Sequence, residues 1–182
     1  FYNFDVMIEE LLGDYEDRKY YGKESGILSN SITKFVKSEE FATLGVDYIK
    51  QAFNWAGAKK EKFLNLVERC DQALKMSNNE FLDFFATKVN DPHEDSFESF
   101  CRDEFKRRLS EDGQFLSNLV DYVNYNGGIK LYMSLVEEFG IDDSTQCLNV
   151  ISSQPSCKRD PAFDYLKRLQ SSYQEIEKGV MS

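Results

Sequence analysis

The sequence predicts an all-α fold in a single domain, built from about eight to ten short amphipathic helices. Apolar residues recur at intervals of three and four along most of the chain, which is the period of a helix with one buried face. No segment sustains the strict apolar–polar alternation that is typical of a half-buried strand. The three prolines, Pro92, Pro155 and Pro161, stand at positions that also suit helix edges. We therefore expect no β-sheet.

Two helices are expected before residue 37. Asp5 can cap a short helix that runs through Leu12 and ends at Gly13, because Asp favours N-caps and Gly favours the position after the last turn. A tyrosine-rich connector, from Tyr15 to Gly22, then leads to Ser25. The second helix is predicted by one apolar stripe, formed by Ile27, Leu28, Ile32, Phe35 and Val36.

Ser38 marks the start of the next helix. Glu39 and Glu40 follow it, and acidic residues in a first turn stabilise a helix through its dipole. This helix is expected to end at Gly57, and one of its faces carries Phe41, Leu44, Tyr48, Ala52 and Trp55. The helix after it carries Phe63, Leu64, Val67, Cys70 and Leu74.

Two phenylalanine-rich helices are expected in the middle of the chain. Ser77 and Asn79 can cap the first, whose apolar residues are Phe81, Leu82, Phe84, Phe85 and Val89. Asp91-Pro92 ends it or begins the second, because proline is tolerated in a first turn and not in a helix interior. The second helix carries Phe97, Phe100, Cys101, Phe105 and Leu109.

A helical hairpin is expected after residue 114. Its first helix carries Phe115, Leu116, Leu119, Tyr122 and Val123. Asn126-Gly127-Gly128 then forms a tight turn that can take positive φ. The return helix ends with Gly140 at its C-cap and carries Ile129, Tyr132, Met133, Leu135, Val136 and Phe139. One more short helix is expected over 142–151, and Pro161 opens a last helix with Phe163, Leu166, Leu169, Tyr173 and Ile176.

Net charge restricts the partners of this chain. Its 32 acidic and 22 basic residues give a net charge of −10, which repels nucleic acid and anionic membranes. The one basic cluster is interleaved with acids, so a solvated, salt-bridged face is the better interpretation and a headgroup or acidic-partner site the alternative; it consists of Arg102, Lys106, Arg107 and Arg108. The apolar runs are far shorter than the roughly 20 residues that span a bilayer. We expect no nucleic acid partner and no transmembrane segment.

Catalytic and metal-binding signals are weak. His93, the single histidine, stands among acids in the segment 91–95 and could help to hold a cation or act as a base, but an exposed helix start explains the segment better. The segment 142–145 resembles half a calcium loop without the required spacing, and predicts a helix cap instead. No Cys-x-x-Cys pair is present. We therefore expect neither an enzyme, nor a cofactor, nor a metal site.

Cysteine pairing bears on the compartment. The four cysteines, Cys70, Cys101, Cys147 and Cys157, allow three pairings. Cys147 and Cys157 suit a local disulfide, after which Cys70 and Cys101 would join neighbouring helices; four reduced thiols in the cytosol are the alternative. The chain begins at Phe1 without a methionine, so it is either a processed mature form or an excised domain. We expect a secreted protein, with the cytoplasm as the alternative.

A faint internal repeat is present within the domain 1–182. Glu40-Phe41 and the apolar pairs after it recur from Glu104-Phe105 onward, with gaps. The repeat halves would be 1–76 and 77–141, with 142–182 as a C-terminal extension. Two unrelated amphipathic hairpins are the alternative.

Aromatic side chains are unusually abundant in the sequence, which has 15 Phe and 10 Tyr. Three interpretations stay open. The rings can fill a fully packed core, line an incompletely filled interior that holds an apolar ligand, or form a surface groove that grips a partner helix.

The segments 35–44 (FVKSEEFATL) and 114–123 (QFLSNLVDYV), with Phe139-Gly140-Ile141 after them, resemble the helical repeats of the insect allergen family, the cockroach-type and midgut microvillar group. Residues 81–84 are similar to the opening of a second repeat unit. The chain departs from the family pattern in its few prolines, its four cysteines and its tail after Gly140. The resemblance implies a helical shell around a lipid-accepting cavity, without catalytic residues. The cavity-facing positions would be Phe41, Leu44, Tyr48, Phe81, Phe84, Phe105, Leu119, Tyr122 and Leu135.

A second resemblance is weaker. Ile32 to Gln51 is similar to one helix pair of the helical domain that binds Arf-like small GTPases, but the acidic segment that should follow is absent. The sequence thus favours a non-enzymatic helical protein that holds a fatty acid or another lipid in an aromatic-lined interior. The alternative is an intracellular helical adaptor that binds a partner protein, for example a small GTPase or a partner helix, through a surface groove. Its oligomeric state is not indicated.

Overall fold

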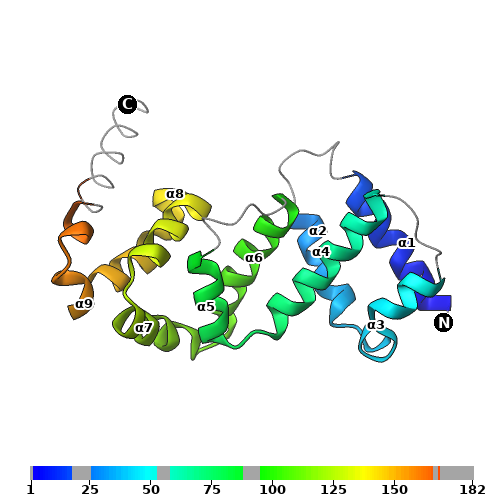
Figure 1. Ribbon diagram of the computed structural model, residues 1–182, viewed down its shortest axis with the longest axis horizontal. Coiled ribbons are helices and arrows are strands. Elements are labelled where there is room, and N and C mark those ends of the chain that lie inside the picture. Colours follow the sequence, from blue (N-terminus) through cyan, green and yellow to red (C-terminus); the bar gives the residue numbers. More distant parts are fainter. Residues whose placement is uncertain (1, 18–25, 53–57, 88–94, 166–167, 169–182) are drawn as a thin grey trace. The chain divides into compact units, whose positions relative to one another are not determined.

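The computed structural model describes residues 2–17, 26–52, 58–87, 95–165 and 168, and these residues include no β-strand (Figure 1). The all-α prediction is confirmed. Among the helices in these ranges, none combines the length and the hydropathy that a membrane span needs. They are α1 (Tyr2–Asp17), α2 (Gly26–Val36), α3 (Glu39–Ala52), α4 (Ala58–Lys75), α5 (Asn78–Thr87), α6 (Asp95–Glu111), α7 (Phe115–Asn126), α8 (Ile129–Ser152) and α9 (Pro155–Lys158).

The helices gather into two compact units. Unit 1 comprises Phe1–Lys75 and His93–Lys106, and unit 2 comprises Met76–Pro92 and Arg107–Ser182, so α6 contributes residues to both. The division after Lys75 lies close to the boundary expected between the repeat halves. The part of the chain after residue 141 belongs to unit 2 together with α5 and α7. Whether the two units are repeats stays a prediction.

Helix α1 is longer than the sequence predicted. It begins at Tyr2 and runs through Gly13 to Asp17, so the expected cap at Asp5, the end at Gly13 and the connector from Tyr15 are wrong. Tyr15 is 4% exposed and its ring centroid lies 5.3 Å from that of Phe63 in α4. Glycine in a helix interior costs about 1 kcal/mol, whereas burying a large side chain contributes about 1.5–3 kcal/mol. The free energy gained by burying Tyr15 therefore exceeds the cost of Gly13 in the helix interior, and the helix continues.

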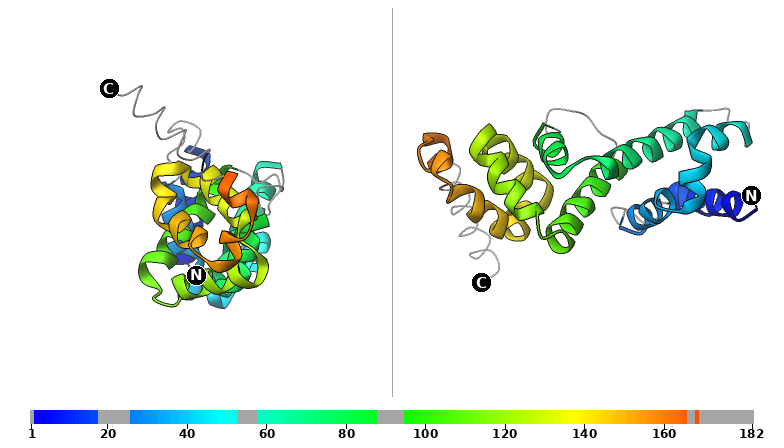
Figure 2. Two further views of the ribbon diagram at one scale, coloured as in Figure 1. Left: turned by 90° about the vertical axis from the view of Figure 1, so that its left-hand side faces the viewer. Right: turned by 90° about the horizontal axis from the view of Figure 1, so that it is seen from below.

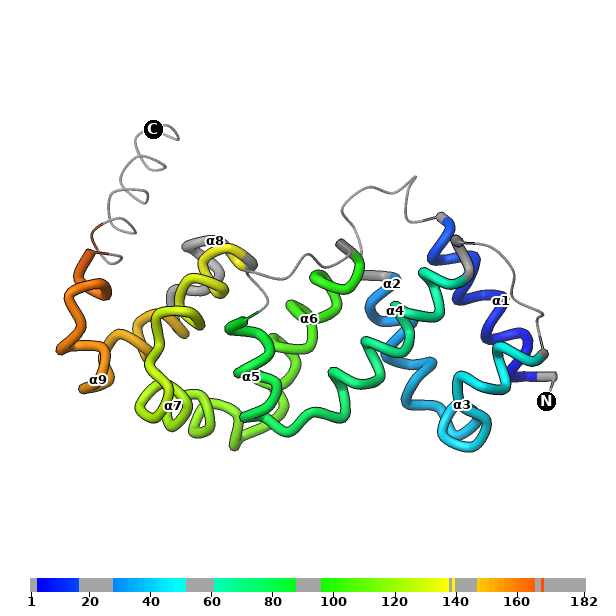
Figure 3. Tube along the Cα trace, viewed as in Figure 1, coloured from blue at the N-terminus to red at the C-terminus, as the bar shows by residue number. Residues whose placement is uncertain are grey.

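Aromatic rings from three helices form the centre of unit 1. The ring of Phe4 in α1 stacks on Phe35 in α2, with centroids 5.4 Å apart, and lies 5.5 Å from Tyr48 in α3. Phe35 in turn lies 5.3 Å from Phe41 of α3. Figure 3 shows α1 and α2 running side by side, in agreement with their packing contacts. The rings of this unit are thus in contact with one another.

The expected start of α3 at Ser38 is confirmed. The Ser38 hydroxyl oxygen accepts a hydrogen bond from the Phe41 N–H at 3.2 Å, and its O–H donates to the Phe35 carbonyl at 2.6 Å. Helix α3 is kinked at Gly45, which has φ 69°. This is the left-handed region, which glycine enters without steric cost.

Unit 2 is organised around α5, which packs against both α7 and α8 (Figure 2). Its N-terminus has a capping box: the Glu80 N–H donates to the Ser77 hydroxyl at 3.2 Å, and the Ser77 N–H donates to the Glu80 carboxylate at 3.4 Å. The predicted cap at Ser77 is confirmed, whereas Asn79, the other expected cap, lies inside α5. The Ser134 hydroxyl of α8 donates to the carbonyl of Ala86 at 3.2 Å, so a buried polar group has its partner.

The turn between α7 and α8 requires glycine twice, for different reasons. Gly127 has φ 79°, which confirms the positive φ expected there. At Gly128 an added Cβ would lie 2.9 Å from Cγ2 of Ile151, 3.0 Å from Cγ1 of Val123 and 3.1 Å from Cζ of Phe163. The turn is therefore packed against the end of α8 and the segment after α9.

Helix α8 does not end at Gly140. It continues to Ser152, so the expected C-cap at Gly140 and the separate helix over 142–151 are wrong, and the segment 142–145, expected at a helix start, lies inside the helix. Leu148 and Ile151, at 1% and 0% exposed, give the added turns a buried face. Pro155 begins α9 as expected, and Asp160 accepts a hydrogen bond from the Ala162 N–H at 3.0 Å at the start of the helical turn 161–165.

The expected disulfides are absent. No two of the four cysteines, all of which lie in the described part of the chain, are at disulfide distance. Each is at most 6% exposed and packs as a small apolar group on the buried side of its helix. Burial also raises the pKa of the Cys147 thiol. The reduced alternative fits this structure.

Several sequence predictions lie outside the described residues. They concern the helix end at Trp55 and Gly57, the segment at Val89, Pro92 and His93, and most of the last helix, including Leu166, Leu169, Tyr173 and Ile176.

Candidate functional site

The structure divides the residues expected to face a ligand between the two units. Phe41, Leu44, Tyr48 and Phe105 belong to unit 1. The members in unit 2 are Phe81, Phe84, Leu119, Tyr122 and Leu135. Within each unit, the set separates further into fully buried and half-buried side chains.

The buried members act as core residues. Phe81, Leu119 and Leu135 are fully buried, as is Phe105, and Phe41 is 5% exposed. The ring of Phe81 lies 6.1 Å from that of Phe85. Of the half-buried members, Leu44, Tyr48, Phe84 and Tyr122, only Tyr122 lines either of the two clefts described next. A ligand role for the nine residues stays a prediction.

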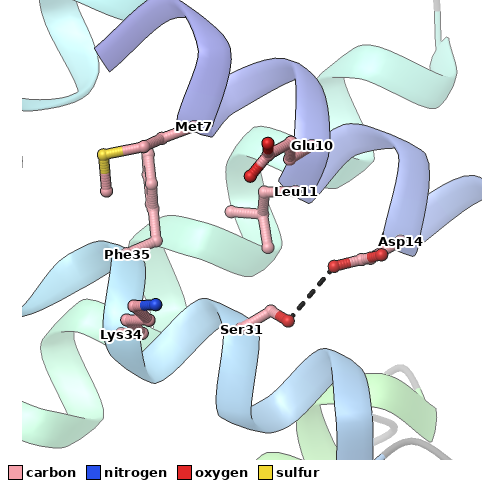
Figure 4. Close-up of a pocket in the computed structure, with 7 residues that line it drawn as sticks. All are labelled: Met7, Glu10, Leu11, Asp14, Ser31, Lys34 and Phe35. Atoms are coloured by element: carbon pink, nitrogen blue, oxygen red, sulfur yellow. Dashed lines mark hydrogen bonds between the residues drawn. The ribbon is translucent and has the colours of Figure 1, made fainter. Parts of the chain in front are cut away.

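The first cleft lies between α1 and α2 in unit 1 (Figure 4) and has a volume of about 170 Å³. Met7, Leu11 and Phe35 form its apolar part, and Phe35 and Leu11 are each 3% exposed. At one end the Ser31 hydroxyl donates to the Asp14 carboxylate at 3.1 Å. Most of the apolar surface here is already covered, so little remains for a ligand to bury.

The charged residues of this first cleft are of both signs. Glu10 and Asp14 come from α1, and Lys34 comes from α2. Two carboxylates against one ammonium leave one net negative charge. The first cleft thus offers only a weak preference for a cation over an anion.

The second cleft lies between α5 and α7 in unit 2 and is larger, about 530 Å³. Its residues form one row on each helix. The α5 row is Asn79, Glu80 and Asp83, and the α7 row is Asp121, Tyr122, Tyr125 and Asn126. Spacings of three and four residues place each row on one helix face. We call this the α5–α7 cleft.

The α5–α7 cleft combines negative charge with an exposed ring. Tyr125 is 87% exposed, the highest value among the exposed large apolar side chains of the described chain. Asp121 lies one helical turn before it on α7. Among the described residues, no Lys or Arg forms an ion pair with Glu80, Asp83 or Asp121. The carboxylates therefore remain available to a cation from another molecule.

One hydrogen bond joins the two sides of this cleft. The Tyr122 O–H donates to Oδ1 of Asp83 at 3.0 Å and so links α7 to α5. Burial, followed by this hydrogen bond and the Asp83 charge, raises the pKa of Tyr122 to about 12. Because each carboxylate oxygen can accept two hydrogen bonds, Asp83 keeps further acceptor sites, including Oδ2. The hydrogen bond from Tyr122 thus restricts the orientation of the Asp83 carboxylate and leaves some of its acceptor sites unused.

A buried arginine supports the N-terminal end of α5, where the cleft begins. Arg108 of α6 is 5% exposed and its guanidinium lies 4.4 Å from the ring centroid of Phe81. It donates to the Met76 carbonyl at 2.9 Å and to Oδ1 of Asn78 at 3.1 Å. The interpretation of the basic cluster as a solvated face is therefore wrong for Arg108.

Asn78 extends this network toward α7. Its amide donates to Oδ2 of Asp112 at 2.9 Å and to Oδ1 of Asn118 at 3.0 Å. The bond from Asn78, with a second from the Gln114 N–H, lowers the pKa of the Asp112 carboxyl. Arg107, by contrast, does behave as expected, since it pairs with Glu111 at 3.4 Å on the surface.

Sequence reasoning missed most of this site. Tyr122 was singled out as a cavity residue, but Asp83, Asp121 and Tyr125 were not. The i, i+4 spacing of Asp121 and Tyr125 is a signal in the sequence. That α7 lies beside α5 is not, because periodicity identifies the exposed face of a helix and not its neighbour.

The described residues contain no cluster of three or more His, Cys, Asp or Glu side chains arranged to hold a metal ion. His93 lies outside them. No protein-family model, curated protein or solved structure matches the chain. The resemblances to the insect allergen repeats and to the Arf-type binding domain therefore stay predictions.

Proposed function

We propose that this protein is a non-enzymatic docking protein whose α5–α7 cleft binds a positively charged segment of a partner protein. The observation that carries the proposal is the α5–α7 cleft itself, where three carboxylates and an exposed tyrosine ring surround about 530 Å³ of open space. No described cation neutralises these carboxylates. A basic segment supplies the complementary charge.

The charge of the whole chain supports this choice of partner. A net charge of −10 attracts basic segments from a distance and repels acidic ones, which raises the association rate more than the final affinity. At physiological salt this attraction extends about 8 Å. Binding should accordingly weaken as salt is added.

A titration with two peptides tests the proposal. The probes are a short fluorescent peptide of alternating arginine and glycine and its counterpart with glutamate in place of arginine, each added to the full chain and followed by anisotropy. We expect saturable binding of the basic peptide alone. Absence of saturable binding even at low salt would refute the proposal.

Paired variants locate the site. Asp83→Asn together with Asp121→Asn removes two charges from the α5–α7 cleft, and we expect the affinity to fall about three- to tenfold, because each exposed pair contributes about 0.2–1 kcal/mol. The matched control is Asp47→Asn with Glu61→Gln, which removes two charges from exposed positions of unit 1. An equal loss in both double variants would show that only net charge matters.

Carriage of an apolar ligand is the second candidate function. The aromatic surplus of 15 Phe and 10 Tyr favours it. Against it, aromatic rings pack on one another at the centre of each unit. Native mass spectrometry of protein from its natural source, with lipid extraction, decides the question: a ligand-free mass and no uptake of a fluorescent fatty acid would remove the carrier function.

The docking function implies that the protein is cytoplasmic, whereas the carrier function implies that it is secreted. The support for the cytoplasm is that the four buried cysteines are not at disulfide distance. Titration of thiols on unreduced, denatured protein from its natural source tests it. We expect four reactive thiols, and a count of none would favour secretion.

A further inference from the structure

We infer that the residue of the partner that enters the α5–α7 cleft is an arginine, whose guanidinium face lies on the Tyr125 ring while its edge donates to the carboxylates of Asp83 and Asp121. This inference rests on the proposed function and specifies the chemistry of the partner. It follows from three features of the cleft: the kinds of group that line it, the fixed orientation of Asp83, and its openness to water.

The α5–α7 cleft offers a flat ring and carboxylates to the same occupant. The Tyr125 ring is 87% exposed, and Asp121 stands one helical turn away on the same face of α7. A guanidinium is planar, so its face can stack on a ring while its N–H groups point outward to carboxylates. An ammonium is a compact point charge and cannot use both surfaces in this way.

The Asp83 carboxylate is already oriented for a forked donor. The Tyr122 hydroxyl holds Oδ1 at 3.0 Å, which restricts rotation of the carboxylate, while Oδ2 keeps both of its lone pairs. Arginine presents parallel N–H donors in a fixed plane and gains from an acceptor whose plane is also fixed. Lysine rotates freely and gains little from this preorganisation.

Openness to water also favours arginine. The polar groups of the α5–α7 cleft, Glu80 and Asp121 among them, are solvent-exposed. Exposed ion pairs stabilise little with either cation, so a cation that also stacks on the ring has the advantage. The guanidinium is more weakly hydrated, so its stacking on Tyr125 adds to the attraction at low desolvation cost.

The chain itself places a guanidinium over a ring elsewhere in its fold. The guanidinium of Arg108 lies 4.4 Å from the Phe81 ring centroid while its N–H groups donate to the Met76 carbonyl and to Asn78. Arg69 lies 5.0 Å from the centroid of the Phe97 ring. A guanidinium that lies over a ring while it donates hydrogen bonds to oxygens therefore already occurs in this fold.

The test compares two peptides that differ only in the cation. Alternating arginine–glycine and lysine–glycine peptides of equal length and label are titrated into the full chain by anisotropy. We expect the arginine peptide to bind about three- to tenfold tighter, the range for one cation–π contact with accompanying hydrogen bonds. Tyr125→Ala should reduce the preference for the arginine peptide to the part that Asp83 contributes, and Tyr125→Phe should keep the whole preference.

Tyr165→Ala is the matched control, because Tyr165 is a 63% exposed tyrosine of unit 2 that does not line the α5–α7 cleft. It should leave both affinities unchanged. Equal binding of the two peptides, or a preference that Tyr125→Ala leaves undiminished, overturns the inference while the docking function stands. Failure of both peptides to bind overturns the docking function as well. Circular dichroism confirms that the variants are folded.

Discussion

Replacing Arg108 by methionine tests whether the buried network under the α5–α7 cleft holds unit 2 together. Methionine keeps the length and the apolar stem of the side chain but removes its charge and all its donors. The Met76 carbonyl and Oδ1 of Asn78 then lose donors that lie 2.9 and 3.1 Å away. The Phe81 ring loses a cation that lies 4.4 Å from its centroid.

The magnitude follows from these contacts. A hydrogen bond to a charged group contributes about 1.5–3 kcal/mol, and a desolvated cation–π contact about 2 kcal/mol. Methionine recovers part of this through apolar packing on Phe81, and water can reach part of the network, so the terms do not add fully. We expect the free energy of unfolding to fall by about 2–4 kcal/mol.

Urea unfolding followed by far-ultraviolet circular dichroism is the assay, with the slope m checked for an unchanged two-state transition. The control is Arg107→Met, the adjacent position, whose exposed pair with Glu111 contributes about 0.3–0.5 kcal/mol. A loss at Arg108 no larger than the loss at Arg107 would refute the reasoning. It would mean that the network neither stabilises unit 2 nor positions α5.

Three further predictions concern single positions. Gly128→Ala should lower the free energy of unfolding by about 1–3 kcal/mol, because the new methyl would lie 2.9 Å from Ile151, and an unchanged urea midpoint would contradict the close packing. Ser38→Ala should cost about 1 kcal/mol through loss of the cap on α3, against no loss for Ser38→Asp, which can also cap. The pKa of Tyr122 is about 12 in the fold against the usual 10.0 of tyrosine, so the folded state holds the proton more tightly. That contribution is complete below about pH 10 and is lost as pH rises through about 12. Tyr122→Phe should therefore show a smaller loss of stability than the wild type across this window; an identical loss would contradict the Asp83 contact.

The sequence predicted local features well where one side chain acts on its own backbone. Ser38 and Ser77 both cap the helices expected from them, and Gly127 takes the positive φ expected of the turn. These signals depend on residues within about four positions of one another. The helical period likewise predicted the fold class without any knowledge of tertiary contacts.

Predictions that depended on tertiary burial were less successful. Gly13 and Gly140 both suggested helix ends, yet α1 and α8 continue past them. The added turns bury Tyr15 in unit 1 and Ile151 in unit 2, and this burial outweighs the cost of an interior glycine. In this chain, a helix therefore continues past a glycine where the residues after the glycine are buried in a core.

The candidate site was the least predictable part. Tyr122 and Asp83 are 39 positions apart, and their contact arises only because α5 and α7 pack side by side. The aromatic residues that the sequence placed around a ligand are mostly the core itself, as Phe81 and Leu119 show. The residues that carry the proposed function belong to the polar face, where hydrophobic periodicity gives no information.

The most direct test of the docking function is a titration of isotope-labelled full-length chain with the arginine–glycine peptide, followed by amide NMR spectra. We predict saturable shifts concentrated at Asn79–Asp83 and Asp121–Asn126, the two rows of the α5–α7 cleft. Shifts that concentrate elsewhere, or that fail to saturate, would contradict the assignment of this cleft as the binding site.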